Sequence, residues 1–263
     1  MARTLIGIIL VFAVFAGLGG LGWYFAKDKI RSKPEYRLSA KNIVVSLPPD
    51  WIPDRFVEDV LHDSGLNRTG SLLDQQLSQR LSEAFAAHPW VEKVEQIIPR
   101  YPSGADVKLS YRVPVALVEV SQRGIFSVDR NGVLLPSEYL AGTITDRRSD
   151  CLTIQGIQST PLGSAGTLWG DPMVQTAAQL AAALTDIARP LNLTRIIPAV
   201  EATPSGERTA WRLKTTAGTE IHWGTFSSDE QQIEAKKKRL WDLHERFRTL
   251  DNVPPNFLDL SRE

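Results

Sequence analysis

Apolar residues between positions 37 and 113 follow first a strand-like and then a helix-like spacing. The run Ile43-Val44-Val45 within Arg37–Leu47 predicts a strand, and Pro48-Pro49 ends it. Apolar residues then recur every three or four positions in two segments, which predicts two amphipathic helices that end before Gly65 and Pro89. The predicted buried faces consist of Phe56, Val57, Val60 and Leu61 in the first helix and of Leu73, Leu77, Leu81, Ala84 and Phe85 in the second.

Strand-like patterns return after the second helix. Val91–Pro99 and Ala105–Val113 predict two strands, joined by a turn at Tyr101-Pro102-Ser103-Gly104. The order strand-helix-helix-strand-strand predicts an α+β domain over residues 36–114, with both helices on one face of a three-stranded sheet. Trp90 stands where the second helix meets the second strand, so we expect it in the core, with contact to a partner as the alternative role.

Residues 115–263 predict a β-rich domain with two helices. Asp171 and Pro172 are typical of a helix start, and Pro190 prevents that helix from extending further. Ser228 and Gln231 fit a capping box at the start of a second helix. The predicted buried faces are Val174, Ala177, Ala181, Leu184 and Ala188, and then Ile233, Leu240, Leu243, Phe247 and Leu250. The predicted strands are Val115–Val120, Gly124–Asp129, Val133–Leu135, Ala210–Thr215, Glu220–Trp223 and a closing strand at Asn256–Leu260.

Ahead of both domains, the segment Leu5–Ala26 contains no charged residue and predicts a transmembrane helix. At ~1.5 Å per residue it would span roughly 33 Å, which is enough for the hydrocarbon core of a bilayer. Trp23 and Tyr24 suit the membrane interface. A cleaved signal peptide is the alternative, although cleavage after Ala26 would put Tyr24 where a small residue is preferred.

The flanks of this segment leave its orientation open. Residues 1–4 are expected to form a cytoplasmic stub and residues 27–35 a charged linker. Only Arg3 precedes the segment, whereas several basic residues follow it, and this bias would favour a cytoplasmic C-terminal part. Long domains are translocated largely regardless of such a bias, so charge alone does not decide the topology.

Charge and reactive residues favour no enzyme class. Thirty basic and thirty acidic residues give no net charge, so composition does not indicate nucleic acid as a partner. Cys151 is alone and cannot form an intrachain disulfide, and we expect a buried, inert thiol. The run Lys236–Arg239 is expected on the solvated side of the last helix, with contact to lipid or nucleic acid as the alternative. The four histidines, His62, His88, His222 and His244, lack metal-ligand spacing, and no catalytic residue, cofactor or small-molecule substrate is predicted.

Three segments marked by proline carry a resemblance to a known family. They are His88-Pro89-Trp90-Val91, Tyr101-Pro102 and Arg112-Val113-Pro114-Val115-Ala116. Their order and spacing resemble the POTRA domain of the bacterial division proteins called FtsQ or DivIB. The segment Ile125–Pro136, with the turn Asn131-Gly132, resembles the hairpin of this family. The terminal Leu258-Asp259-Leu260 also falls in the family's order, so the resemblance extends from the apolar segment to the end of the chain.

The resemblance implies a non-enzymatic, single-pass scaffold of the cell inner membrane, with its large C-terminal part outside the cytoplasm. Such a protein docks membrane division proteins of the FtsB/FtsL class within the divisome and links them to septal wall synthesis. The alternative is a POTRA-containing component of a secretion or outer-membrane assembly system. Such a system needs a C-terminal transmembrane barrel of many alternating strands, which about 150 residues with two long helices cannot supply. A membrane-tethered hydrolase is a third possibility, but the chain lacks an evident pair of nucleophile and base.

The resemblance also implies a partner site at the C-terminal edge, where a partner segment would add a strand to the sheet. Alternatively, Phe257 and Leu258 only complete the core. Arg112 and Pro114 are expected to set the angle between the domains. The residue before Arg112 is Tyr111, where the family often has an acidic residue, so we infer no ion pair at position 111. The partner-binding residues predicted in this way are Phe257, Leu258, Asp259 and Leu260, followed by Arg208 and Trp211 on a nearby strand.

Overall fold

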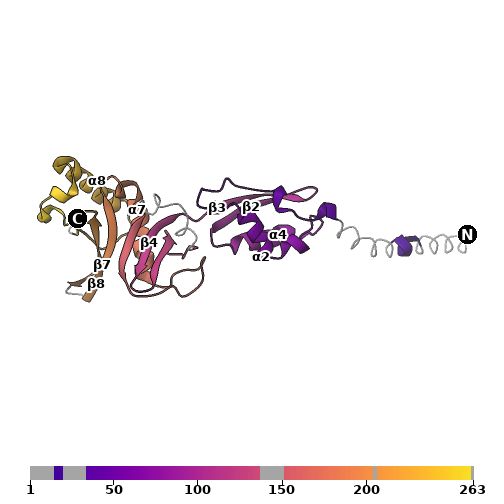
Figure 1. Cartoon of the computed structure of the whole chain (residues 1–263), viewed down its shortest axis with the longest axis horizontal. Coiled ribbons are helices and arrows are strands. Elements are labelled where there is room, and N and C mark those ends of the chain that lie inside the picture. Colours follow the sequence, from indigo (N-terminus) through magenta and orange to yellow (C-terminus); the bar gives the residue numbers. More distant parts are fainter. Residues whose placement is uncertain (1–14, 20–33, 137–150, 204–205, 262–263) are drawn as a thin grey trace, which may run out of the picture. The chain divides into compact units, whose positions relative to one another are not determined.

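The computed structural model describes residues 15–19, 34–136, 151–203 and 206–261 (Figure 1). The chain divides into two compact units, Met1–Tyr111 and Arg112–Glu263. The sequence placed the corresponding boundary between Pro114 and Val115. The described residues combine helices with two separate sheets, which is an α+β structure.

The predicted transmembrane helix over Leu5–Ala26 requires correction. In the part of the chain that the structure describes, every helix is too short or too polar to cross a bilayer. Of the predicted segment, only residues 15–19 are described, and this helical piece is far shorter than the ~20 residues that a span needs. The rest of Leu5–Ala26 lies outside the described residues.

The first unit is built on a three-stranded sheet with the order β1-β3-β2. β1 (Ile43–Val45) runs parallel to β3 (Gly104–Tyr111), and β2 (Val91–Arg100) runs antiparallel to it. The helices α2 (Phe56–Asp63) and α4 (Leu77–Ala86) lie on one face of this sheet (Figure 1). The chain order β1-α2-α4-β2-β3 is therefore the order that the periodicity indicated. The core consists mainly of Phe56, Val60, Leu61, Leu77, Leu81, Phe85, Trp90 and Val107.

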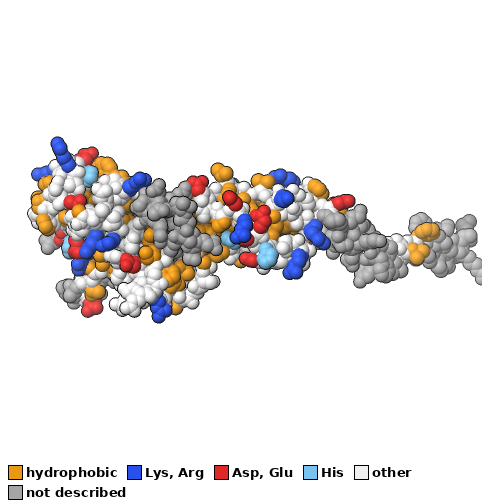
Figure 2. Space-filling view, viewed as in Figure 1, with side chains coloured by type: hydrophobic (Ala, Val, Ile, Leu, Met, Phe, Trp, Pro, Cys, Tyr) orange, Lys and Arg blue, Asp and Glu red, His pale blue; other side chains and the backbone are white. Residues whose placement is uncertain are grey.

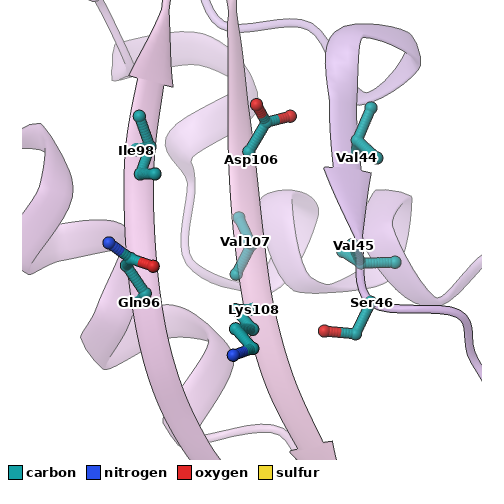
Figure 3. Close-up of a pocket in the computed structure, with 8 residues that line it drawn as sticks. All are labelled: Val44, Val45, Ser46, Gln96, Ile98, Asp106, Val107 and Lys108. Carbon is teal, nitrogen blue, oxygen red and sulfur yellow. The ribbon is translucent and has the colours of Figure 1, made fainter.

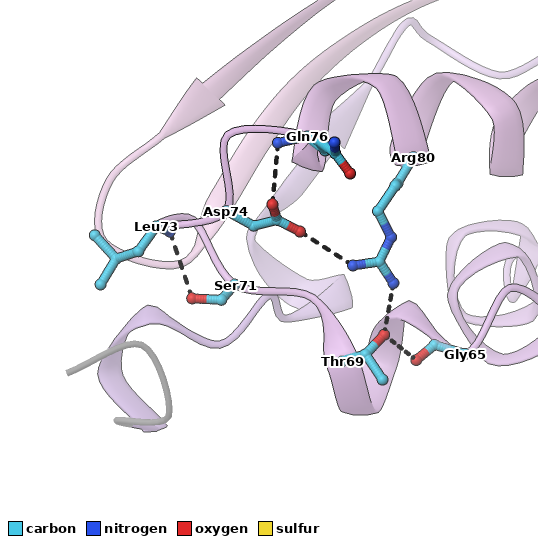
Figure 4. A network of polar contacts seen from close by, with 7 residues as sticks. All are labelled: Gly65, Thr69, Ser71, Leu73, Asp74, Gln76 and Arg80. Carbon is cyan, nitrogen blue, oxygen red and sulfur yellow. Dashed lines mark hydrogen bonds and ion pairs between the residues drawn. The ribbon is translucent and has the colours of Figure 1, made fainter. Parts of the chain in front are cut away.

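A short helix, α3 (Leu66–Thr69), and a polar network join the two main helices of this unit (Figure 4). Arg80 of α4 donates to Asp74 Oδ2 at 3.1 Å and to Thr69 Oγ1 at 2.8 Å. Asp74 Oδ1 in turn accepts from the backbone N–H of Gln76 at 3.0 Å. Because these bonds connect the end of α3, the loop and the start of α4, they fix the connection between the two helices. The sequence did not predict α3.

The second unit contains a six-stranded sheet with the order β5-β4-β6-β7-β8-β9. The pairs β4–β6 and β6–β7 are parallel, and the other neighbours are antiparallel. Helix α7 lies against β4, β6 and β7 (Figure 1). The elements are β4 (Pro114–Val120), β5 (Gly124–Asp129), β6 (Leu152–Ile157), α7 (Pro172–Ala188), β7 (Leu193–Thr203), β8 (Gly206–Thr215), β9 (Glu220–Gly224) and α8 (Glu230–Phe247). Short 3-10 helices are η1 (Pro34–Tyr36), η2 (Ala40–Asn42), η3 (Leu250–Asn252) and η4 (Pro255–Phe257).

The helix starts of the second unit are set by aspartates. Asp171 accepts from the backbone N–H of Met173 at 2.8 Å, and Pro172 is the first helical residue, which confirms the predicted start of α7. The capping box predicted for α8 is wrong. Asp229, one residue after Ser228, is the N-cap, and it accepts from the backbone N–H of Gln231 at 3.0 Å.

The predicted closing strand at Asn256–Leu260 is also wrong in part. Residues Pro255–Phe257 form η4, and only Asp259 then makes a single parallel bridge, to His222. The physical reason lies in Pro254 and Pro255, which fix φ and have no N–H to offer a ladder.

Candidate functional site

The last described residues close the outer edge of β9. The backbone N–H of His222 donates to Leu258 O at 2.9 Å, and the N–H of Leu260 donates to His222 O at 2.8 Å. The side chains of Leu258 and Leu260 are buried in the core of the second unit. We call Leu258–Ser261 the C-terminal strap. It belongs both to the sheet and to the core.

Phe257 and Asp259 are the more accessible of the residues predicted at this edge. The Phe257 side chain is 38% exposed, and its ring centroid lies 6.5 Å from that of Phe247 on α8. Asp259 Oδ1 accepts from the backbone N–H of Ser261 at 3.0 Å and from its hydroxyl at 2.5 Å. A partner at this edge would therefore meet Phe257 and Asp259 directly, while Leu258 and Leu260 face inward.

Arg208 and Trp211 both line a surface cavity of about 390 Å³. Arg208 is exposed, whereas Trp211 is only 2% exposed, so Trp211 can offer a partner little of its surface. The other lining residues come from the first turn of α7, from β8 and from the segment after β9: Pro172, Met173, Thr176, Thr209, Thr225 and Phe226.

Gly224 connects this cavity with the C-terminal strap. It pairs with Trp211 across β8 and β9. A Cβ at position 224 would lie 2.7 Å from Ser261 Cα, so the strap passes directly beside this glycine. The structure thus places the predicted residues in two groups of the second unit, Arg208 and Trp211 at the cavity and Phe257 to Leu260 at the edge of β9, with Gly224 between them.

Among the described residues that line the cavity, Arg208 carries the one formal charge. The first turn of α7 contributes Pro172 and Met173, but the carboxylate of its N-cap, Asp171, offsets the partial positive charge of this helix end. Within the described ranges no ion pair involves Arg208, although Glu201 stands opposite it on β7. These features fit an acidic group that approaches next to apolar surface.

Lys236 lies under the strap instead of on the solvated face of α8. Its amino group donates to Trp223 O at 2.6 Å and lies 5.2 Å from the centroid of the Trp223 ring. Burial lowers the pKa of Lys236, and the carboxylate of Asp259 partly opposes this effect. Lys237 pairs with Asp186 of α7 at 2.7 Å. The expectation that Lys236–Arg239 is a solvated run is therefore wrong for its first two residues.

The outer face of the sheet in the first unit offers a second, smaller surface (Figure 3). Val44, Asp106 and Ile98 form a row across β1, β3 and β2, and both apolar side chains are about half exposed. They border a cavity of about 290 Å³. Asp106 is paired with Arg100, and Lys108 with Glu95 at 3.4 Å, so the charges on this face largely neutralise one another.

The residues predicted to be structural lie as follows. Trp90 is 1% exposed. Arg112 Nη1 donates to Asp129 Oδ2 at 2.7 Å, an ion pair that the sequence analysis did not infer. Asp129 is buried and also accepts from the backbone N–H of Asn131 and of Val133, each at 2.9 Å. Pro114 is the first residue of β4 and pairs with Asp129.

Cys151 is half-buried, not fully buried as expected, and its Sγ lies 3.9 Å from Pro114 O. Across residues 15–19, 34–136, 151–203 and 206–261, no three His, Cys, Asp or Glu side chains gather as a metal site would require. Basic and acidic side chains are interspersed on the face shown in Figure 2.

No family model and no curated protein matches this sequence. The resemblance to the FtsQ/DivIB family therefore stays a prediction.

Proposed function

We propose that this chain is a non-enzymatic docking scaffold of the bacterial cell division complex. It binds membrane division proteins of the FtsB/FtsL class and links them to septal wall synthesis. The proposal includes an extracytoplasmic position at the inner membrane and does not assign a spanning helix. The sequence resemblance motivates it, and one observation supports it: the C-terminal strap, which follows Phe257 in the chain, passes beside Gly224, and Gly224 pairs with Trp211 of the cavity of Arg208.

The chemistry of this surface favours recognition through side chains. Arg208 would bind a carboxylate of the partner through charge-assisted hydrogen bonds. Phe257 is the exposed aromatic residue that an apolar partner side chain would cover, and such residues are common anchors of interfaces.

The structure favours side-chain contacts over the addition of a long partner strand at this edge. In the strap, the N–H of Leu260 and the C=O of Leu258 are already bonded to His222. Asp259 has its backbone groups directed away from β9, because it lies between the two bonded residues of a parallel bridge, and the N–H of Ser261 is already bonded to the Asp259 carboxylate. We therefore expect backbone pairing to contribute little beyond this residue.

The test is affinity purification of the full chain from bacterial membranes, followed by mass spectrometry of the proteins that co-purify. Arg208→Glu should reduce recovery of FtsB/FtsL-class proteins at least about tenfold, because reversing a charge at an interface costs several kcal/mol. Phe257→Ala should also reduce it.

Arg195→Glu is the matched control. Arg195 is an exposed arginine on β7 that does not line the cavity, so its reversal should leave recovery unchanged. Equal recovery with the wild type, Arg208→Glu and Phe257→Ala would overturn the assignment of the surface. Recovery of outer-membrane assembly proteins in place of division proteins would favour the alternative function.

A further inference from the structure

β9 is the last strand of the six-stranded sheet, and its outer edge is covered by the chain itself. An uncovered edge strand presents unpaired backbone groups that can pair with another chain. At the centre of β9, both backbone groups of His222 point to this edge, and both are bonded to the C-terminal strap at 2.9 and 2.8 Å. The strap therefore occupies the position that an added strand would take.

The strap also ends the sheet. Asp259 bonds the backbone N–H and hydroxyl of Ser261 through its own carboxylate. On the other side, Pro254 and Pro255 have no N–H, and Pro255–Phe257 is turned into η4. Among the described residues, neither the segment before the strap nor Ser261 at its end thus offers a row of extended backbone groups to a further strand.

Gly224 allows the strap to lie this close to β9. Its φ is +80°, a conformation that favours glycine. A Cβ at this position would lie 2.7 Å from Ser261 Cα and 2.9 Å from Ser261 Cβ, which are distances that force one of the two segments to move.

We infer that the strap guards the edge of β9 against a second copy of this chain, and that loss of the strap turns this edge into a self-association surface. Two β9 strands can pair antiparallel about a two-fold axis at His222, which gives the same interface on both copies. Glu220 of each copy would then stand opposite Gly224 of the other and His222 opposite His222, so no two carboxylates would meet across the pair. The inference does not depend on the proposed function.

The experiment compares the full-length wild type with Gly224→Ala, by hydrogen exchange of the His222 amide and by light scattering over a concentration series. At the lowest concentration, the His222 amide should exchange at least about tenfold faster in Gly224→Ala, because its acceptor Leu258 O is displaced. At higher concentration, Gly224→Ala should gain one association step that the wild type lacks, and His222 should become protected again.

Gly218→Ala is the matched control. Gly218 also has a positive φ of +94°, but a Cβ there meets nothing within 4 Å. It therefore reproduces the backbone strain without touching the strap, and it should match the wild type in both measurements.

Two results would overturn the inference. One is fast exchange of His222 in Gly224→Ala while the variant keeps the association state of the wild type at every concentration. The other is fast exchange of His222 in Leu260→Ala without self-association, in the case where Gly224→Ala leaves the exchange rate unchanged and so does not displace the strap. If Gly224→Ala does not fold, Leu260→Ala decides by the same two measurements, because it loosens the buried end of the strap without adding an atom beside it.

Discussion

At the scale of single residues, Lys236 is unusual because it carries an amino group into the core of the second unit. It is 7% exposed, and its amino group donates to Trp223 O. Burial lowers the pKa of Lys236. Between this lowered value and the ordinary value of 10.5, the unfolded chain binds the proton more strongly than the folded chain, so the free energy of unfolding rises with pH in this interval.

We therefore predict that Lys236→Met removes part of this alkaline rise. The wild type should gain stability relative to Lys236→Met as pH increases towards 10.5, and should lose it again as pH falls through the lowered pKa. Urea unfolding of both proteins at a series of pH values measures the difference. Lys238→Met serves as a control, because Lys238 is exposed. A constant difference between wild type and Lys236→Met from pH 7 to pH 10 would show that Lys236 is equally basic in both states.

The sequence contained part of the signal for this burial. The apolar face of α8 runs through Ile233, Leu240 and Leu243, and position 236 fills the gap in this three-and-four spacing. Because residues 236–239 are all basic, the sequence indicated a solvated face at this position and not a buried lysine. No comparable signal existed for the pair of Arg112 and Asp129, because the pairing of β4 with β5 brings these residues together and the local sequence does not.

At the scale of elements, one aspartate at the start of α7 makes two separate contacts. Asp171 caps the helix through Met173, and its other carboxylate oxygen accepts from the Ser159 hydroxyl at 2.5 Å. Ser159 also accepts from Trp169 Nε1 at 3.1 Å. The cap thus connects the 17-residue helix with the loop that precedes it.

Asp171→Ala should cost about 1–2 kcal/mol of unfolding free energy, at the upper end of the usual cost of losing an N-cap. Asp229→Ala should cost less, because Asp229 caps α8 through a single bond in an exposed position. Asp171→Asn keeps the capping acceptor and should recover most of the loss. Urea unfolding of the three variants provides the comparison, and a larger loss for Asp229→Ala than for Asp171→Ala would contradict this ranking.

The success of sequence-based prediction also differed between elements. The long helices were found because periodicity and caps are local signals, as Asp171 and Pro172 illustrate. Strands β6 and β7 were missed. Pro198 argues against an internal strand, yet it is tolerated because the residue pairs between β6 and β7 end at Ile196. Of the candidate site, the sequence indicated the edge residues through resemblance, but not the burial of Trp211 or the connecting role of Gly224.

At the scale of the whole molecule, the two units have separate hydrophobic cores. The large core cluster of the second unit contains residues from Ala116 onwards, whereas Trp90 and Phe85 belong to the core of the first. A change in one core is therefore expected to act on the unit to which it belongs, because each unit has buried apolar residues of its own.

We predict that Trp90→Ala destabilises the first unit by roughly 3–5 kcal/mol, the usual cost of removing a buried aromatic side chain, and leaves the second unit unchanged. Hydrogen exchange of the full chain in increasing urea, read by mass spectrometry of peptides, reports on the two units separately. Peptides from residues 34–111 should lose protection at lower urea, and peptides from residues 112–261 should not. Trp241→Ala is the control, because Trp241 is 39% exposed and its loss should shift neither set much. An equal shift of both sets in Trp90→Ala would show that the two units unfold as one cooperative body, and unchanged protection in residues 34–111 would show that Trp90 contributes little to the first core.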